Sequence, residues 1–302
     1  MSFESRRRAE VRMPMTIHNH LAVTADASHR DVREAPSARI IPPPDDSTAN
    51  IPCARVLGVP VHVIDAPGVV RQMDAWIQGR YRQRWIAVTS SHGIVEGFKH
   101  PEFRQILESA ALSVPDGEWT ARVAAARLSL APLRVRGADL ILAFCALAAQ
   151  RGYSAYFLGD TVEVLERLTS KLRSQFPGMR IAGAYSPPFR HLGGDENDLI
   201  VKKINDAKPD VVWVLLGLPK QELWIFANRP RLNAPIVVAA GAAAKFVSGN
   251  VTAAPAWISR HGLEWLWRLA REPRRCWHRA MVYGPQFALY TLLELKGLRR
   301  FD

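Results

Sequence analysis

The chain has 302 residues, of which 48% are hydrophobic and 23% charged, and its formal net charge is +12. This length gives room for one large or two small domains with a substantial core, and no apolar run approaches the roughly 20 residues that a membrane span needs. Three widely separated cysteines argue against a disulfide framework or a zinc site and favour a reducing cytoplasm. The first residues lack the apolar core of a secretory signal, so we expect a cytoplasmic protein, soluble or attached to a membrane surface.

The basic surplus is concentrated near the C-terminus. Residues 1–50 contain seven Lys/Arg and seven Asp/Glu, whereas residues 258–302 contain nine Lys/Arg and four Asp/Glu, together with Trp265, Trp267 and Trp277. This mixture suits an anionic partner, which includes a phospholipid surface, a diphosphate or nucleic acid. We expect no nucleic acid partner, because the basic residues alternate with Trp and Leu as in an interfacial helix, and no nucleic-acid-binding module is recognisable.

The chain divides into three parts. Residues 1–50 are rich in Ser, Pro, Asp and Arg and are predicted to be a disordered tail, residues 51–257 a core, and residues 258–302 a basic helical segment. Predicted strands cover 57–64 (one or two short strands), 85–88, 112–114, 155–158, 180–183, 211–216 and 235–240. Predicted helices cover 65–78, 101–110, 118–128, 138–149, 162–176, 197–206, a stretch beginning near 220, 262–271 and 285–297. Strands alternate with helices up to Trp257, which predicts an α/β, Rossmann-like, doubly wound and mostly parallel sheet with a helical C-terminal appendage.

Polar side chains directly follow several predicted strands, and in such a sheet they converge on one edge. They are Thr89, Ser91, Asp116, Arg136, Asp160, Lys220, Gln221 and Glu222. The sequence contains no GxGxxG, GxxxxGK[ST], HExxH or GxSxG motif, so it offers neither a dinucleotide fingerprint nor a Walker loop, and we expect no metal and no cofactor.

Two of these residues have alternative interpretations. Asp116 lies in a Pro-Asp-Gly turn after an apolar run, where it is either a general base or a turn residue satisfied by local hydrogen bonds. Arg136 either binds phosphate or faces solvent. The stretch PDVVWVLLGLPKQE (209–222) is either a ligand site at a strand–glycine–helix junction or an ordinary connection.

The order and spacing of these motifs resemble those of the WecG/TagA/CpsF glycosyltransferases (glycosyltransferase family 26) over about residues 55–280. The matching blocks are VTSSHGIV with Thr89, the Asp116-Gly117 turn, RVRGADL (134–140), FLGD (157–160), GLPKQELW (217–224), GAA (241–243), APAW (254–257) and GLEWLWRL…EPRR (262–275). The PKQE and GLEW…RL…EP blocks are the most specific. The SPPF loop (186–189) resembles the branch associated with exopolysaccharide assembly, including the xanthan-type enzyme that adds the second glucose.

The resemblance implies an enzyme that transfers a hexose, with inversion, from a UDP-sugar to a sugar on a polyprenyl diphosphate, without a metal held by a DxD motif. It favours glucose, with an N-acetylmannosamine-type sugar as the other donor. It implies that Asp116 is the general base and that Thr89 lines the site. The donor-binding residues that it implies or that lie beside these motifs are Ser91, Arg136, Gly159, Asp160, Gly217, Lys220, Gln221, Glu222 and Lys245.

The same resemblance assigns arginines of the basic C-terminal segment to the lipid-linked acceptor. The mixture of basic and aromatic residues there predicts attachment to an anionic membrane surface on the inner face of the cell membrane. The alternative is a helical lid packed on the core, and the two roles can coexist. Candidates for the lipid diphosphate are Arg268, Arg271, Arg274, Arg275 and Arg279. Some relatives associate through the core domain, so the resemblance leaves a homo-oligomer open.

The sequence departs from the family pattern at two places. Ser91 stands where the family has Asn, and GAAAKF replaces GAAFDF, so that Lys245 replaces an aspartate expected near the nucleotide. This charge reversal keeps a second hypothesis open, that of a catalytically impaired protein that binds a nucleotide sugar or a lipid diphosphate. Because Asp116 is present, an active enzyme is favoured.

Overall fold

The structure is a computed structural model that describes residues 47–190 and 192–298, so the predicted tail lies almost wholly outside the described residues. Its centre is a parallel sheet of six strands: β3 (Arg84–Thr89), β4 (Leu112–Pro115), β5 (Ser154–Gly159), β6 (Arg180–Tyr185), β7 (Val211–Leu215) and β8 (Ile236–Ala239). The strand order across the sheet is β4-β3-β8-β7-β5-β6, and every neighbouring pair is parallel. The predicted parallel α/β sheet is therefore confirmed.

The alternating side chains of β7 explain why its sequence is apolar throughout. Val212 and Val214 pack into a hydrophobic cluster on one face of the sheet, whereas Val211, Trp213 and Leu215 pack into a second cluster on the other face. A strand covered on both faces gains from apolar residues at every position, because neither set of side chains meets water.

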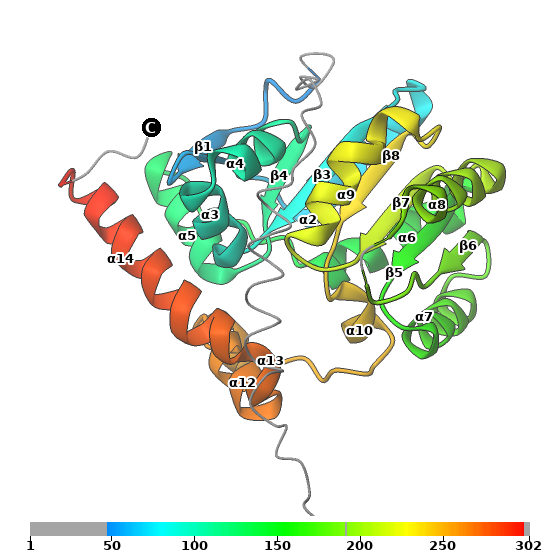
Figure 1. The fold of residues 1–302 in the computed structure, drawn as a ribbon. Coiled ribbons are helices and arrows are strands. Elements are labelled where there is room, and N and C mark those ends of the chain that lie inside the picture. The colour runs from blue at the N-terminus through cyan, green and yellow to red at the C-terminus, as the bar shows by residue number, and fades with distance from the viewer. Residues whose placement is uncertain (1–46, 191, 299–302) are drawn as a thin grey trace, which may run out of the picture.

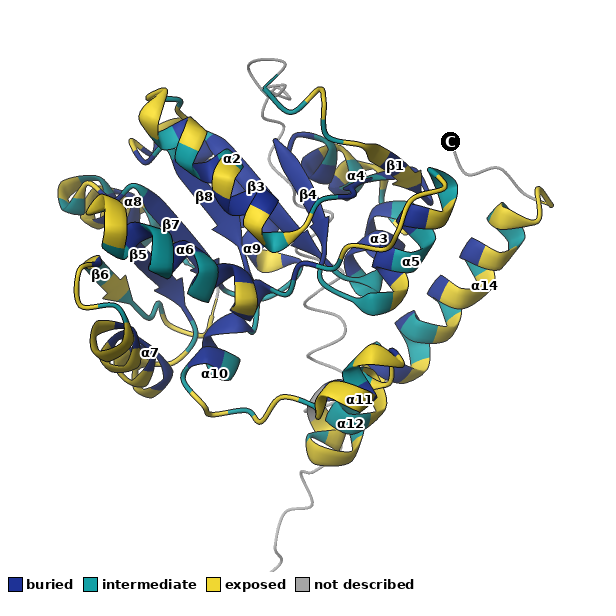
Figure 2. Ribbon diagram, turned by 180° about the vertical axis from the view of Figure 1, so that it is seen from behind, coloured by how far each residue is buried: buried dark blue, intermediate teal, exposed yellow. Residues whose placement is uncertain are grey.

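Helices cover both faces, which makes the fold doubly wound. The first face carries α3 (Ser91–Lys99), α4 (Pro101–Glu108), α5 (Glu118–Arg127), α8 (Gly194–Ala207) and α9 (Lys220–Asn228), with the short 3₁₀ turn η1 (Arg229–Arg231) after α9. The second face carries α2 (Ala66–Gln78), α6 (Gly137–Arg151), α7 (Val162–Gln175) and α10 (Ala243–Val247). Figure 1 shows α9 in front of the sheet, and the reverse view in Figure 2 shows α2 and α6 there.

An antiparallel hairpin, β1 (Cys53–Val56) and β2 (Val59–His62), precedes the main sheet. It corresponds to the one or two short strands predicted for residues 57–64, but it begins earlier and turns at Leu57 and Gly58. The ring nitrogen Nδ1 of His62 accepts a hydrogen bond from the main-chain N–H of Ser113 at 3.1 Å. Burial lowers the pKa of His62, which favours the neutral ring that can accept this bond.

Helix α3 was not predicted, because residues 90–100 contain two serines and two glycines, which have low helix propensity. Its packing explains the glycines. A Cβ atom at Gly97 would lie 2.7 Å from Cγ2 of Val59 in the hairpin, so the helix approaches β2 only because this position has no side chain. A tertiary contact thus outweighs the local preference.

The regular elements of the C-terminal segment, as far as the structure describes it (to residue 298), are helical, as predicted. They are α11 (Ala256–Arg260), α12 (Glu264–Arg271), α13 (Pro273–His278), a π-helical turn η2 (Arg279–Tyr283) and α14 (Gly284–Leu295). The sequence predicted two helices here and missed α11, α13 and η2. In Figure 1, α12 and α13 lie near the end of the sheet that carries α10, and α14 runs back along α3 and α5. The ion pair between Arg127 and Glu294, 2.5 Å long, joins α14 to the core.

Candidate active site

The carboxyl ends of the strands bring most of the predicted site residues to one edge of the sheet. Following the strand order, Asp116 comes after β4, Thr89 ends β3, Gly241 and Lys245 follow β8, Gly217 and Gln221 follow β7, and Asp160 follows β5. The crevice at such an edge is where open α/β sheets bind ligands. The predicted convergence of these residues agrees with this arrangement.

Asp116 is fixed through its backbone and one carboxylate oxygen. Its main-chain N–H donates to the carbonyl of Thr89 at 2.9 Å. Its Oδ1 accepts from the main-chain N–H of Gly137, at the start of α6, at 3.2 Å. Oδ2 has no hydrogen bond to any described residue, and the residue is only partly buried. One oxygen is therefore held in place, and the other remains available to a hydroxyl group.

Thr89 has a structural role at the same edge. Its side chain is 2% exposed, and its hydroxyl oxygen lies 3.1 Å from that of Ser113 on β4. This contact joins the ends of β3 and β4 below the turn that carries Asp116. That Thr89 also touches a substrate stays a prediction.

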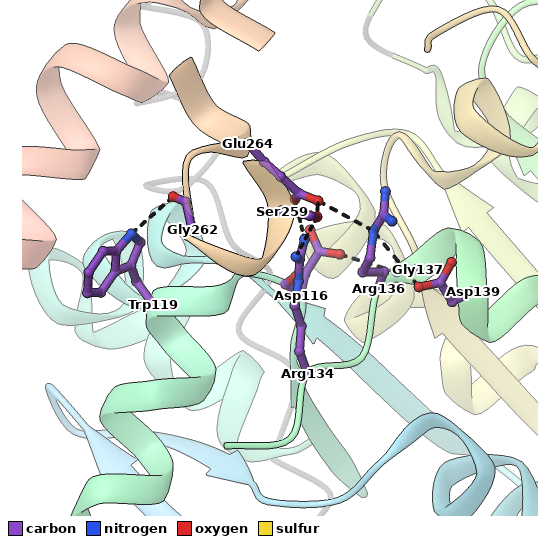
Figure 3. A network of polar contacts seen from close by, with 9 residues as sticks. All are labelled: Asp116, Trp119, Arg134, Arg136, Gly137, Asp139, Ser259, Gly262 and Glu264. Atoms are coloured by element: carbon purple, nitrogen blue, oxygen red, sulfur yellow. Dashed lines mark hydrogen bonds and ion pairs between the residues drawn. The ribbon is translucent and has the colours of Figure 1, made fainter. Parts of the chain in front are cut away.

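Arg134 and Arg136 flank Asp116 and meet the C-terminal segment. Arg134 Nε donates to the main-chain carbonyl of Asp116 at 2.6 Å, and its Nη2 bonds the carboxylate of Glu264 on α12. Arg136 Nε lies 3.9 Å from Asp139 and 3.9 Å from Glu264. Figure 3 shows the two arginines reaching Glu264 from the loop that precedes α6.

The charges in this network stabilise one another. Burial alone would lower the pKa of Arg134, but the hydrogen bond and the negative charge of Glu264 outweigh it, and the pKa of Arg134 is raised. Burial alone would raise the pKa of Glu264, but its bonds from Arg134 and Ser259 and the two nearby arginine charges lower it. Both groups are therefore charged at neutral pH.

Gln221 joins two of the turns at the edge. Its Oε1 accepts from the main-chain N–H of Gly217 at 3.2 Å and of Gly241 at 2.8 Å, and its Nε2 donates to Glu222 at 2.8 Å. The side chain is 3% exposed. Gln221 thus shapes the backbone between β7 and β8, and the predicted contact with the donor stays a prediction.

Glu222 is a buried carboxylate behind this turn. It is 2% exposed, and its Oε2 has no hydrogen bond among the described residues. Burial raises its pKa to about 7, against the opposing effects of the bond from Gln221 and the charge of Arg279. Glu222 thus lies inside the core behind the turn, and its predicted contact with the donor stays a prediction.

The turn after β5 carries an ion pair that involves the residue departing from the family pattern. Lys245 Nζ lies 3.4 Å from Asp160 Oδ1, and the same oxygen accepts from the main-chain N–H of Thr161 at 2.9 Å. A Cβ at Gly159 would lie 2.6 Å from the main-chain carbon of Leu215, so β5 and β7 close together only with glycine there. Lys245 thus neutralises a carboxylate at the edge.

Lys220 follows β7, the strand next to β5, which precedes Asp160. It is exposed at the start of α9, and its Nζ lies 5.5 Å from the centre of the Phe189 ring. Phe189 belongs to the SPPF loop and is 99% exposed, and Ser186 ties the loop to the main-chain carbonyl of Asp160 by a 2.6 Å hydrogen bond. A cation and an aromatic ring thus follow β7 and β6, which lie on the other side of the strand order from β4 and Asp116.

A second contact between the core and the C-terminal segment lies at the start of α3, where Ser91 is partly buried. Arg279 Nη2 donates to Ser90 Oγ at 3.3 Å, and the rings of His92 and Tyr283 are 3.8 Å apart. Burial, followed by the charge of Arg279, lowers the pKa of His92 well below its usual value. His92 is therefore neutral at physiological pH, which agrees with a packing role.

Four of the five predicted lipid-diphosphate residues have side chains that the structure describes, and their contacts differ. Arg268 stacks over Phe246 of α10 at 5.4 Å, and Arg271 stacks over Trp267 at 4.8 Å. Arg274 is exposed, Arg279 of η2 contacts Ser90 before the start of α3, and the side chain of Arg275 lies outside what the structure describes. Arg268 and Arg279 therefore face the core, while Arg271 and Arg274 are on the outer side.

Sequence reasoning gave no role to Arg134, Glu264 or Phe189. Arg134 and Glu264 were within the RVRGADL and GLEW blocks, but 130 positions separate them and nothing local indicates that they meet. Within the described parts of the chain, no three His, Cys, Asp or Glu side chains are grouped closely enough to hold a metal ion.

The carboxylate of Asp116 and the two arginines beside it lie at the edge of a doubly wound sheet, where they offer a proton acceptor and positive charge to a ligand. The family model described as "Glycosyl transferase WecG/TagA/CpsF family" matches residues 54–301, and the chain belongs to this family of glycosyltransferases. This confirms the resemblance drawn from the motifs.

Two similar proteins share the name N-acetylglucosaminyldiphosphoundecaprenol N-acetyl-beta-D-mannosaminyltransferase. The protein of Bacillus subtilis strain 168 is 30% identical over 203 residues, which cover 67% of this chain and 77% of the relative. The protein of Bacillus spizizenii strain W23 is 32% identical over 199 residues, 65% of this chain and 74% of the relative.

Proposed function

We propose that this glycosyltransferase moves a hexose, with inversion, from a UDP-sugar to a sugar carried on a polyprenyl diphosphate, in exopolysaccharide biosynthesis. The observation that carries the proposal is the carboxylate of Asp116, with Oδ1 fixed by Gly137 and Oδ2 unbonded among the described residues. The names of the two relatives support a lipid-diphosphate-linked acceptor.

In the proposed reaction Asp116 accepts the proton of the attacking acceptor hydroxyl. The hydroxyl oxygen forms a bond to the anomeric carbon of the donor, the bond from that carbon to the UDP oxygen breaks, and UDP leaves with the electron pair. Attack from the side opposite to UDP inverts the anomeric carbon. The departing diphosphate requires positive charge, which Arg136 and the exposed Lys220 can provide.

Lys245 bears on the choice between an active transferase and a catalytically impaired protein that only binds a nucleotide sugar or a lipid diphosphate. Its ion pair with Asp160 offsets the positive charge that the departure from the family pattern introduces. Lys245 follows β8, whereas Asp116 follows β4, with β3 between these two strands. No ion pair or hydrogen bond joins Lys245 to Asp116 among the described residues, which favours an active enzyme over a protein that only binds.

We also propose that the C-terminal segment attaches the enzyme to the inner face of the cell membrane. In the described part of the chain no helix has the length and apolar character to cross a bilayer. Large apolar side chains nevertheless reach the surface just before this segment and within it: Trp257, Trp265, Leu266, Trp277, Met281, Leu289, Leu292 and Leu295. Figure 2 shows much of α11, α12 and the outer side of α14 as exposed. With the exposed Arg271 and Arg274 nearby, this surface suits anionic lipid headgroups.

The deciding experiment is a donor screen with purified protein and a synthetic polyprenyl-diphosphate sugar. UDP release and a lengthened lipid-linked product with UDP-glucose or UDP-N-acetylmannosamine support the proposal, and the productive donor identifies the hexose. Binding of UDP-sugars without turnover of any donor, in the presence of the acceptor, would instead support the binding protein. Release of UDP that requires a divalent cation would contradict the metal-independent form of the reaction.

A further inference from the structure

Glu264 lies where the C-terminal segment meets the catalytic edge. It is the first residue of α12, and its carboxylate accepts hydrogen bonds from Arg134 and from Ser259. Its Oε1 is also 3.9 Å from Arg136 Nε. One carboxylate from the appendage therefore lies between both arginines that flank Asp116, as Figure 3 shows.

Arg134 connects Glu264 to the backbone of Asp116. The guanidinium binds Glu264 through Nη2 and the carbonyl of Asp116 through Nε. The side chain of Arg134 is only 16% exposed, so without Glu264 its charge would be poorly solvated and would lose its counter-charge. The orientation of Arg134, and with it the support of the Asp116 turn, therefore depends on a residue outside the core.

Arg136 is held more loosely. Its Nε is 3.9 Å from each of two carboxylates, which is beyond hydrogen-bond distance, and no hydrogen bond joins its side chain to a described residue. Glu264 and Asp139 thus attract the guanidinium electrostatically and leave its N–H donors available. This arrangement keeps Arg136 near Asp116 while an anionic ligand can still take up its donors.

Other contacts attach the C-terminal segment to the core without reaching the arginines beside Asp116. Trp119 Nε1 donates to the carbonyl of Gly262 at 3.2 Å, and Arg122 Nη2 donates to the carbonyl of Arg260 at 3.0 Å. These bonds join α5 to the same turn of the appendage without touching either arginine beside Asp116. They provide a matched comparison for Glu264.

We propose that Glu264 is a positioning residue, through which seating of the C-terminal segment sets the geometry of Asp116 and Arg136 at the catalytic edge. The inference rests on the proposed transferase function for its effect on turnover, but its structural part stands independently. It predicts that the core is correctly arranged for transfer only when α12 is in place.

The test compares Glu264→Gln with Arg122→Ala in the full chain. Glu264→Gln retains size and one acceptor but loses the charge shared by the two arginines. Because a small misplacement of a reacting group is costly, kcat should fall about 10- to 100-fold. Arg122→Ala removes one attachment of the appendage and should keep kcat within about twofold. Equal losses in the two variants would reduce Glu264 to an attachment point and overturn the proposal.

A double-mutant cycle guards against a folding artefact. Arg134→Gln should lower kcat to a similar extent, and the double variant Glu264→Gln/Arg134→Gln should be no worse than either single variant, because both remove one connection. Independent, multiplying losses would overturn the connection between these residues.

A readout without catalysis separates this inference from the proposed function. The main-chain N–H of Gly137 donates to Asp116, so amide hydrogen exchange reports on this contact. Exchange of residues 134–137 should be faster in Glu264→Gln than in the unaltered chain. Exchange of the same residues should be unchanged in Arg122→Ala. If the unaltered chain shows no transfer for any donor, the proposed function fails while the exchange result still decides the positioning role. Unchanged exchange in Glu264→Gln would contradict that role even in an active enzyme.

Discussion

The side-chain oxygen of Gln221 accepts a 2.8 Å hydrogen bond from the main-chain N–H of Gly241, twenty residues further along the chain. The same oxygen accepts from Gly217, so one buried amide joins the turns after β7 and β8. These turns lie at the centre of the strand order, between the side that carries Asp116 and the side that carries Asp160.

Replacing Gln221 with Ala should therefore destabilise the protein. The change removes two main-chain contacts and the bond to Glu222, and we expect a loss of about 2 kcal/mol in the free energy of unfolding. Urea unfolding measures this loss, with Gln175→Ala on the exposed surface of α7 as the control. Equal unfolding midpoints for the two variants would show that the amide does not join the turns in solution.

Glu222 predicts a pH dependence of stability. Burial raises its folded-state pKa to about 7 from 4.5, so the folded protein retains the proton after the unfolded chain has lost it. The contribution of Glu222 to stability therefore decreases as the pH rises from about 4.5 to about 7. Glu222→Gln cannot ionise, and it should be more stable than the unaltered chain by about 3 kcal/mol at pH 8 and similar to it near pH 4.5.

Unfolding curves between pH 4.5 and 8 measure this difference. Glu102→Gln, at an exposed position of α4, controls for the loss of one carboxylate. A constant difference between Glu222→Gln and the unaltered chain across this range would mean that Glu222 does not titrate there.

The ion pair between Lys245 and Asp160 should contribute measurably to stability. The lysine side chain is 20% exposed and the aspartate side chain 4%, so water screens the pair incompletely. In a double-mutant cycle with Lys245→Met and Asp160→Asn, we expect a coupling energy of about 1 kcal/mol. Additive effects of the two substitutions would show that the pair is not formed. Restoring the family residue with Lys245→Asp would place two carboxylates together, and that variant should be the least stable of the set.

Asp116→Asn should abolish most of the transfer activity and leave the fold intact. Asparagine can still accept the hydrogen bond from Gly137, but it cannot take a proton from the acceptor hydroxyl. We expect turnover to fall about 10²- to 10⁴-fold, with binding of the UDP-sugar retained. Product formation measured beside Asp206→Asn, an exposed carboxylate on α8, gives the comparison. Full activity of Asp116→Asn would exclude Asp116 as the base.

The exposed tryptophans of the appendage predict membrane attachment. Trp265 and Trp277 are 43% and 59% exposed, and replacing both with Ala removes apolar area that would otherwise enter the interface. The variant should float less with vesicles containing anionic lipid, whereas Leu199→Ala, which removes an exposed leucine from α8, should float normally. Undiminished flotation of the tryptophan variant would assign attachment to another surface.

Local patterns determined the sheet and the family. The apolar run of β7 predicts a strand covered on both faces, and glycine or aspartate at the strand ends predicts the edge where Asp116 and Asp160 lie. Blocks such as PKQE and GLEW identify the family because they are contiguous. These features depend on neighbouring residues, whose effects on backbone and burial are readable along the chain.

Tertiary structure alone decided which residues meet at that edge. The packing of α3 needs Gly97 against the hairpin, the charge of Lys245 is neutralised by Asp160, and Glu264 reaches Arg134 from 130 positions away. Each of these contacts joins segments that are distant in sequence, and their energies arise from burial and charge in the folded chain. No local pattern carries that information, so the connection between the appendage and Asp116 appears only in three dimensions.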